Sequence, residues 1–273
     1  MVDFFATYDA LLERWPVTVS PVDIPSAYGT TRVIVCGPEE GSPLLLLSTW
    51  RATATVWYAN VGDLAGTHRV FAVDHVGHSV FDGKPFAGVD DLMTWLDGLL
   101  DGLGLESTAL CGHSYGSWMA LSYALHAPER VSRLALLDPA DCFTTLRLPY
   151  RLRAVPLMLG PNRRRVRSFL TWETGGRPLD PDWLTVTALE SERPGPRLVF
   201  PRRPAPERFA GFAIPTLVVL AGQSKAIDIR RTESAARRLI PDVEIVVLPD
   251  ATHHSIPMVD AGTLNQALLG FLG

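Results

Sequence analysis

The sequence contains little cysteine and no long apolar run. Its three cysteines, Cys36, Cys111 and Cys142, are too few and too scattered for a disulfide framework or a cysteine-based metal site. An apolar stretch such as PLLLL (43–47) has the length of a strand and is far too short to cross a membrane as a helix. The N-terminal segment MVDFFATYDALLERWP has no basic-then-apolar leader, so we expect no signal peptide and a cytoplasmic protein.

Lysine is also scarce, since 23 of the 25 basic residues are arginine. Residues 142–210 hold 13 of these arginines against six acids, a net charge of +7, so the rest of the chain carries −11. Because the whole chain has a net charge of −4, it does not resemble a nucleic-acid-binding protein, and we expect neither nucleic acid nor a membrane as partner. The basic segment instead favours an anionic small-molecule substrate or an acidic carrier protein.

Several cofactor motifs are missing. The chain has no glycine-rich phosphate loop, no Cys-x-x-Cys pair and no His-Glu-x-x-His, and GLG at 102–104 ends a predicted helix rather than opening one. We therefore expect no metal ion and no organic cofactor.

Short apolar runs alternate with helical patterns along most of the chain. This alternation is typical of an α/β protein with a mainly parallel sheet and helices on both faces. We predict strands at 31–37, 43–48, 69–74, 107–112, 131–138, 215–222 and 243–250. We predict helices at 53–65, 89–103, 114–127, 230–240 and 258–272. The stretch from Asp138 to Phe212 interrupts the alternation and is rich in proline and arginine, which indicates an insertion.

The segment LCGHSYGSW (110–118) lies between a predicted strand and a predicted helix. Gly112 and Gly116 stand two residues before and after Ser114, where the backbones of a tight strand-to-helix turn nearly touch. This is the Gly-x-Ser-x-Gly nucleophile elbow, which exposes a serine hydroxyl at the N-terminus of a helix. A serine nucleophile needs a histidine base and an acid to orient that base, and LPDATHHSIPMVD supplies His253 and His254 late in the chain.

Over nearly its whole length the chain resembles the α/β-hydrolase family. The resemblance is carried by YGTTRVIVCGPEEGSPLLLL (28–47), VWYANVGDLAGTHRVFAVDHVGHSVFDG (56–83), CGHSYG and PDATHH. It implies an α/β-hydrolase core formed by residues 1–140 and 211–273. It also implies a helical lid, residues 141–210, inserted after the family's sixth strand.

The resemblance also implies roles for several residues. Ser114 is the expected nucleophile, and His253, preferred over His254, is the expected base. The backbone N–H groups of Tyr115 and Trp50 are the expected donors of the oxyanion hole. His75, His78 and His113 are expected to pack in loops or shape the pocket rather than act in catalysis.

The chain departs from the family pattern at two positions that matter for the site. Thr49 stands where most members have the glycine of a His-Gly pair, which puts the geometry of the Trp50 donor in question. Thr252-His253, by contrast, matches the catalytic pair, which usually reads Gly-His in the family. Lys225 occupies the usual acid position after the strand at 215–222, and a cation there cannot orient a neutral imidazole.

Three aspartates compete to replace that acid. Asp138 ends the strand at 131–138, at an alternative acid position used by some family members, and it is the preferred choice. Asp228 lies three residues beyond Lys225 and is the second choice, and Asp141 is the third.

The expected activity is that of a serine hydrolase that cleaves an ester or another activated acyl group through an acyl-serine intermediate, with natural-product tailoring as a candidate setting. Two alternatives use the same triad: a lyase that eliminates an acyl group, and a thioesterase that serves a carrier protein. A third alternative is a degenerate hydrolase that binds a small-molecule ligand without turning it over.

Overall fold

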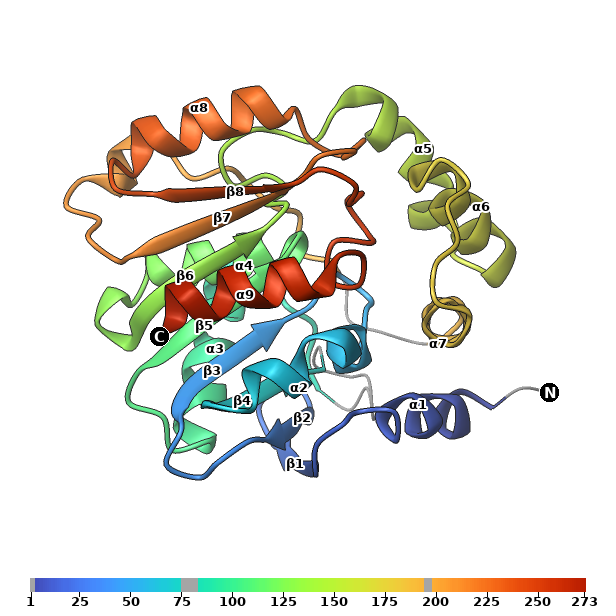
Figure 1. Cartoon of the computed structure of the whole chain (residues 1–273), viewed down its shortest axis with the longest axis horizontal. Helices are drawn as coiled ribbons and strands as arrows, with labels where there is room; N and C mark the ends of the chain where they lie inside the picture. The colour runs from blue at the N-terminus through green and yellow to red at the C-terminus, as the bar shows by residue number, and fades with distance from the viewer. Residues whose placement is uncertain (1–2, 75–82, 194–197) are drawn as a thin grey trace.

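The computed structural model of the chain describes residues 3–74, 83–193 and 198–273. The expectations for His75 and His78 therefore fall outside the described residues. At the centre lies one eight-stranded sheet with the strand order β1-β2-β4-β3-β5-β6-β7-β8 (Figure 1). The strands are β1 (Ser20–Ile24), β2 (Thr31–Cys36), β3 (Ser42–Leu47), β4 (His68–Val73), β5 (Thr108–His113), β6 (Val131–Leu137), β7 (Thr216–Ala221) and β8 (Glu244–Leu248).

Pairing in the sheet changes from antiparallel to parallel. β1 pairs with β2, and β2 with β4, in antiparallel register, and every pairing from β4–β3 through β7–β8 is parallel. Parallel strands are covered by helices on both faces, which explains why the central strands are continuous apolar runs. Every residue of β5 and β7 is buried, and so are Leu44, Leu45, Leu46 and Leu47 of β3.

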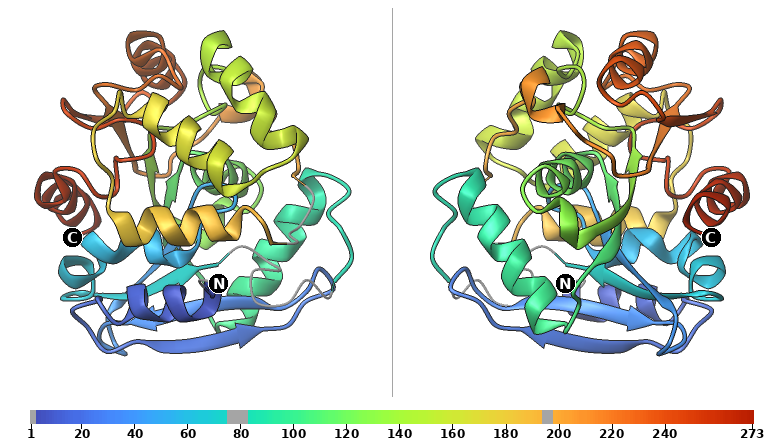
Figure 2. Two further views of the ribbon diagram at one scale, coloured as in Figure 1. Left: turned by 90° about the vertical axis from the view of Figure 1, so that its right-hand side faces the viewer. Right: turned by 90° about the vertical axis from the view of Figure 1, so that its left-hand side faces the viewer.

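Helices cover both faces of this sheet, and a further group of helices lies at one end of its strands (Figure 1). The α-helices are α1 (Phe4–Leu12), α2 (Val61–Leu64), α3 (Val89–Gly102), α4 (Tyr115–Ala124), α5 (Leu148–Leu159), α6 (Arg163–Glu173), α7 (Pro181–Glu190), α8 (Ile229–Leu239) and α9 (Ala261–Leu272). In Figures 1 and 2, α2 and α9 lie on one face of the sheet, and α3 and α4 lie on the other. Within the described ranges, no helix has the length and apolar character needed to cross a membrane.

The segment between β6 and β7 contains α5, α6 and α7. Figure 1 shows these three helices together at the right of the sheet, apart from the helices that cover its faces. They are not isolated from the rest of the chain, because α7 packs against α1. The Arg14 guanidinium lies 2.9 Å from the Asp180 carboxylate at the start of α7.

The seven predicted strands agree with β2 to β8 within two residues at each end. The predicted helix at 53–65 is wrong in detail, because it is a 3₁₀ helix, Ala54–Ala59, followed by the short α2. The predicted helix at 258–272 begins only at Ala261. β1 was not predicted, because it is an edge strand with proline, aspartate and only one buried residue, and so shows no apolar pattern.

Candidate active site

Three side chains meet at the carboxyl ends of three parallel strands of the sheet. Ser114 follows β5, Asp138 follows β6, and His253 follows β8. Two of them are tied directly to the sheet: the Ser114 N–H donates to the Leu137 carbonyl at 3.0 Å, and the Asp138 N–H donates to the Val219 carbonyl at 2.7 Å. Carboxyl ends of parallel strands are where open α/β sheets place their sites.

Ser114 occupies a strained turn between β5 and α4. Its φ of 56° and ψ of −112° lie outside the regions that non-glycine residues ordinarily adopt. The turn requires glycine on both sides: a Cβ on Gly112 would lie 2.3 Å from the Gly116 carbonyl oxygen, and a Cβ on Gly116 would lie 2.2 Å from the Leu47 carbonyl oxygen. The expected close approach of the backbones is therefore present.

A continuous hydrogen-bonded chain connects Ser114, His253 and Asp138. Ser114 Oγ lies 2.7 Å from His253 Nε2, and His253 Nδ1 lies 2.6 Å from Asp138 Oδ2. All three side chains are buried, and Asp138 is fully so. With Nδ1–H donating to the carboxylate, Nε2 is left to accept the serine proton, which is the arrangement of a general base.

Asp138 is held in place by two further donors. The Ala221 N–H donates to Oδ1 at 3.1 Å, and the Ser224 hydroxyl donates to Oδ2 at 2.7 Å. Both donors come from the end of β7 and the loop that follows it, which is the loop that carries Lys225. The end of β7 and this loop therefore hold the Asp138 carboxylate in place through one backbone N–H and one serine hydroxyl.

The two other candidate acids have different contacts. Asp228 caps α8, where its carboxylate accepts from the Arg231 N–H at 3.1 Å and lies 3.6 Å from the Arg231 guanidinium. Asp141 accepts from the Leu146 N–H at 3.4 Å, and burial raises the pKa of its carboxyl. Neither has a hydrogen bond to His253 within the described residues. The Lys225 ammonium donates to the Trp172 carbonyl and lies 5.0 Å from the centre of the Trp172 ring.

The loop after β3 carries the residues expected to form the first oxyanion donor. The Ala52 N–H donates to the Thr49 carbonyl at 3.0 Å, and the Ser48 hydroxyl donates to the Ala52 carbonyl at 2.9 Å, so the loop closes as a compact turn. Arg51 adopts a φ of 58° within it. The second expected donor, Tyr115, begins α4, where backbone N–H groups point out of the helix end.

Two more histidines surround His253, and burial keeps both neutral. His113 Nε2 donates to the His253 carbonyl at 2.7 Å, and burial lowers the pKa of His113 to about 3. His254 Nε2 lies 2.9 Å from the Tyr150 hydroxyl, and burial lowers its pKa well below the ordinary value. The structure thus brings His253 to Ser114, and places His113 and His254 as its neighbours.

Sequence reasoning missed Glu173, the last residue of α6. Its side chain is fully buried, and its carboxylate accepts hydrogen bonds from the loop that carries His253. A signal was available: Val166, Phe169 and Leu170 are the other buried residues of α6, and Glu173 continues their helical spacing. A glutamate on the apolar face of a helix indicates a carboxylate with a specific partner.

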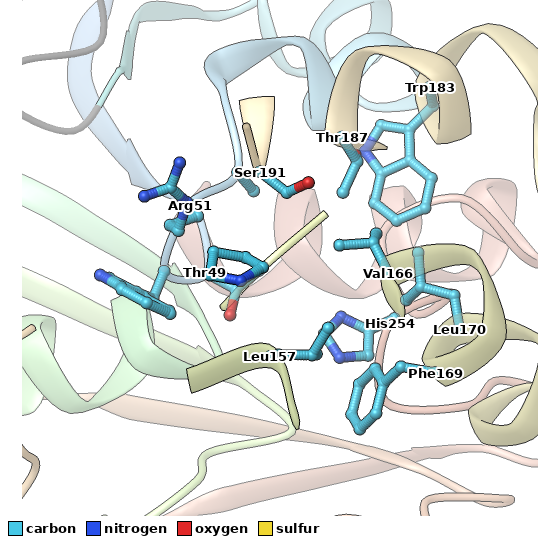
Figure 3. Close-up of a pocket in the computed structure, with 13 residues that line it drawn as sticks. Thr49, Arg51, Leu157, Val166, Phe169, Leu170, Trp183, Thr187, Ser191 and His254 are labelled. Atoms are coloured by element: carbon cyan, nitrogen blue, oxygen red, sulfur yellow. The ribbon is translucent and has the colours of Figure 1, made fainter. Parts of the chain in front are cut away.

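An apolar cavity of about 100 Å³ lies between the loop after β3 and His254, the residue that follows His253 (Figure 3). The turn after β3 supplies one wall, His254 another, and α5, α6 and α7 the rest. The residues that line the cavity are Thr49, Trp50, Arg51, Ala52, Leu157, Pro161, Val166, Phe169, Leu170, Trp183, Thr187, Ser191 and His254. Within the described part of the chain, histidines, cysteines and carboxylates nowhere gather in the groups of three or more that could hold a metal ion.

Known proteins resemble the chain in sequence and in structure. A model of the alpha/beta hydrolase family matches residues 44–267. The chain is 28% identical to the uncharacterized carboxylesterase nap of Bacillus subtilis (strain 168), covering 99% of this chain and 92% of that protein. It is 25% identical to carboxylesterase YbfK of the same organism, over 98% of this chain and 93% of that one.

The fold of the chain also resembles that of solved esterases. The crystal structure of naproxen esterase (carboxylesterase NP) from Bacillus subtilis superposes with a TM-score of 0.89 at 27% identity, covering 99% of this chain and 97% of that one. The chain therefore belongs to the alpha/beta hydrolase family.

Proposed function

We propose that this protein hydrolyses carboxylic esters through an acyl-enzyme intermediate on Ser114. The observation that carries the proposal is the unbroken chain from Ser114 Oγ through the His253 ring to Asp138, with spacings of 2.7 and 2.6 Å. Similarity to carboxylesterases over nearly the whole chain supports the ester as the substrate class.

The proposed reaction has two halves. His253 Nε2 takes the proton as Ser114 Oγ attacks the ester carbonyl, and the Tyr115 and Trp50 N–H groups hold the resulting oxyanion. Collapse of this intermediate breaks the bond to the alcohol oxygen, which takes the proton from His253. A water molecule then repeats the sequence at the acyl-serine and releases the carboxylic acid. Asp138 stabilises the protonated imidazole in both halves without itself taking a proton.

A fluorophosphonate probe tests the proposal directly, since it forms a covalent bond only with an activated serine. We expect the wild-type protein to be labelled and Ser114→Ala to be unlabelled. We also expect the variant to lose several orders of magnitude in kcat on p-nitrophenyl esters, because nucleophile and base act as a unit. An unlabelled, inactive wild-type protein would instead support a hydrolase relative that binds a ligand without turning it over.

The cavity suggests the shape of one half of the substrate. Its volume of about 100 Å³ is smaller than that of a pocket for a drug-sized ligand, which is about 300 Å³ or more. Its walls are mostly apolar side chains from α5, α6 and α7. We therefore propose a small apolar group, such as a short or branched acyl chain, as its occupant.

A basic groove next to the cavity supports an anionic group on the other half of the substrate. The groove has a volume of about 420 Å³ and shares Leu157 and Phe169 with the cavity. Arg153, Arg164 and Arg165 line it, and none of the three forms an ion pair with a carboxylate among the described residues.

The same surface favours a second candidate, a thioesterase that acts on an acyl group attached to an acidic carrier protein. On α5, Leu148 and Leu152 are each 63% exposed and Leu159 is 81% exposed, and Arg153 of the groove lies on the same helix. An acidic, partly apolar protein surface complements this combination. The proposal predicts a KM at least about tenfold lower for an acyl group on a carrier protein than on free pantetheine. Equal KM values for the two would favour the small ester.

A further inference from the structure

We propose that the last turn of α6, Trp172 and Glu173, is a fixed part of the active site that positions His253, and that Lys225 and Thr252 hold it there. This inference rests on the proposed function, because it assigns a role in the same reaction. Glu173 is a positioning residue, since it acts on the base and not on the substrate.

Glu173 binds one loop through three hydrogen bonds. Its carboxylate accepts from the His253 N–H at 3.0 Å, from the His254 N–H at 3.3 Å and from the Thr252 hydroxyl at 2.9 Å. No lysine or arginine forms an ion pair with it among the described residues. Burial of this carboxylate carries a desolvation cost, which these three hydrogen bonds offset.

Both ring nitrogens of His253, its backbone N–H and its backbone carbonyl therefore each have a hydrogen-bond partner. Asp138 accepts from ring Nδ1, Glu173 accepts from the backbone N–H, and His113 donates to the backbone carbonyl at 2.7 Å. A base must keep its ring within a few tenths of an ångström of the serine hydroxyl, and such restraint comes from the groups that surround it. The Glu173 carboxylate also attracts the positive charge that His253 acquires during the reaction.

Lys225 and Thr252 both contact this same turn of α6. Lys225 stands at the usual acid position, but its ammonium donates to the Trp172 carbonyl and lies over the Trp172 ring. A cation is stabilised there, because the carbonyl groups of a last helical turn carry partial negative charge. Thr252 replaces the usual glycine and supplies a hydroxyl donor to Glu173 that glycine lacks.

These hydrogen bonds also restrict movement of the segment between β6 and β7. α6 cannot swing away from the sheet as part of a rigid lid unless the bonds from Lys225, Thr252 and the His253 backbone all break.

Steady-state kinetics on a p-nitrophenyl ester test the inference with one variant and one matched pair. For Glu173→Gln we expect kcat to fall about 10- to 100-fold with KM changed less than about twofold, because hydrogen bonds to a charged group are lost at the base and not at the substrate. For Thr252→Val, which keeps the shape but removes the hydroxyl, we expect a smaller fall in kcat. Thr252→Ser, which keeps the hydroxyl, should retain a kcat close to that of the wild type.

The double variant Glu173→Gln/Thr252→Val should lose less than the product of the two single losses, because both changes weaken or remove the hydrogen bond between residues 173 and 252. A Glu173→Gln protein that folds and keeps wild-type kcat overturns the inference, and so does a loss confined to KM. If Glu173→Gln does not fold, equal kcat values for Thr252→Val and Thr252→Ser overturn it. Fluorophosphonate labelling of the wild-type protein separates this failure from a failure of the proposed function.

Discussion

Asp138 and Asp228 differ in the hydrogen-bond donors that their carboxylates bind. Asp138 is fully buried and accepts hydrogen bonds from the His253 ring, Ser224 and the Ala221 N–H. Asp228 is 47% exposed at its side chain and caps α8. An asparagine can replace a capping aspartate with little loss, but it cannot supply the negative charge that a protonated imidazole requires.

We therefore predict that Asp138→Asn lowers kcat by about 10⁴, the loss known for the same change in the serine-protease template. Asp228→Asn should change kcat less than about twofold, because the cap is preserved. Ester hydrolysis measured on both variants, with circular dichroism to verify folding, provides the check. The reverse order of losses would return the acid to the loop after β7.

His113 leads to a prediction about stability and pH. Burial lowers its pKa to about 3 in the folded protein, whereas an unfolded histidine titrates near pH 6.5. As the pH falls below about 6.5, the unfolded chain takes up a proton that folded His113 does not, so the free energy of unfolding decreases. His254, whose pKa is also lowered, contributes in the same direction.

Urea unfolding between about pH 6.5 and pH 5.5 measures this slope, since most carboxylates stay ionised in that range. We expect the free energy of unfolding to fall toward the acid end, and to fall less steeply in His113→Gln. If the free energy of unfolding depends on pH equally in the wild type and in His113→Gln, the pKa of His113 is not the cause of the pH dependence.

At the level of elements, the β5–α4 turn tolerates no side chain on its glycines. In Gly112→Ala the new methyl group would lie 2.3 Å from the Gly116 carbonyl oxygen; Gly112 is held in β5 and Gly116 in the first turn of α4. We predict a loss of about 3 kcal/mol or more in the free energy of unfolding, because the clash cannot be relieved by a rotamer change.

Gly98, inside α3, is the matched control, since a Cβ there meets no atom within 4 Å. Gly98→Ala should raise the free energy of unfolding by about 1 kcal/mol, the difference in helix propensity. Denaturant titration of both variants distinguishes the two positions. Similar changes in the free energy of unfolding for Gly112→Ala and Gly98→Ala would mean that the turn around Ser114 can relax to accept the extra methyl group.

At the scale of the whole molecule, charge is divided between an acidic body and a basic segment. Residues 142–210 carry a net charge of +7 and the rest of the chain −11. Attraction between that segment and an anionic substrate weakens with salt, since the screening length falls to about 8 Å near physiological ionic strength.

We predict that KM for an ester with an anionic acyl or alcohol part rises with salt, while KM for a neutral ester of the same shape does not. Arg153→Gln/Arg164→Gln should raise the anionic KM at low salt and flatten its salt dependence. Arg167→Gln serves as control, because Arg167 lies on α6 but does not line the groove. If the KM of the anionic ester does not change with salt, these arginines do not attract the substrate and are solvated surface residues.

Much of the fold could be predicted because its signals are local. The apolar runs of β2 to β8 and the glycines around Ser114 each lie within a few consecutive residues. β1 has no such signal, because its residues are mostly exposed at the sheet edge. The helix after β3 also differs from its pattern, since the chain there begins as a 3₁₀ turn whose Ala54 N–H binds the Asp74 carboxylate at 2.6 Å.

The sequence by itself determined the order of serine, aspartate and histidine, the strand-to-helix turn at Ser114 and the family resemblance. Only the tertiary structure decided which carboxylate meets His253, because Asp138 is 115 residues away from it in the chain. The same holds for Glu173, which lies 80 residues from the backbone N–H that it binds, and for Lys225, whose partner is 53 residues away. Such contacts depend on where the parallel strands end side by side in the sheet, and a charged side chain does not reveal its distant partner through its own neighbours in sequence.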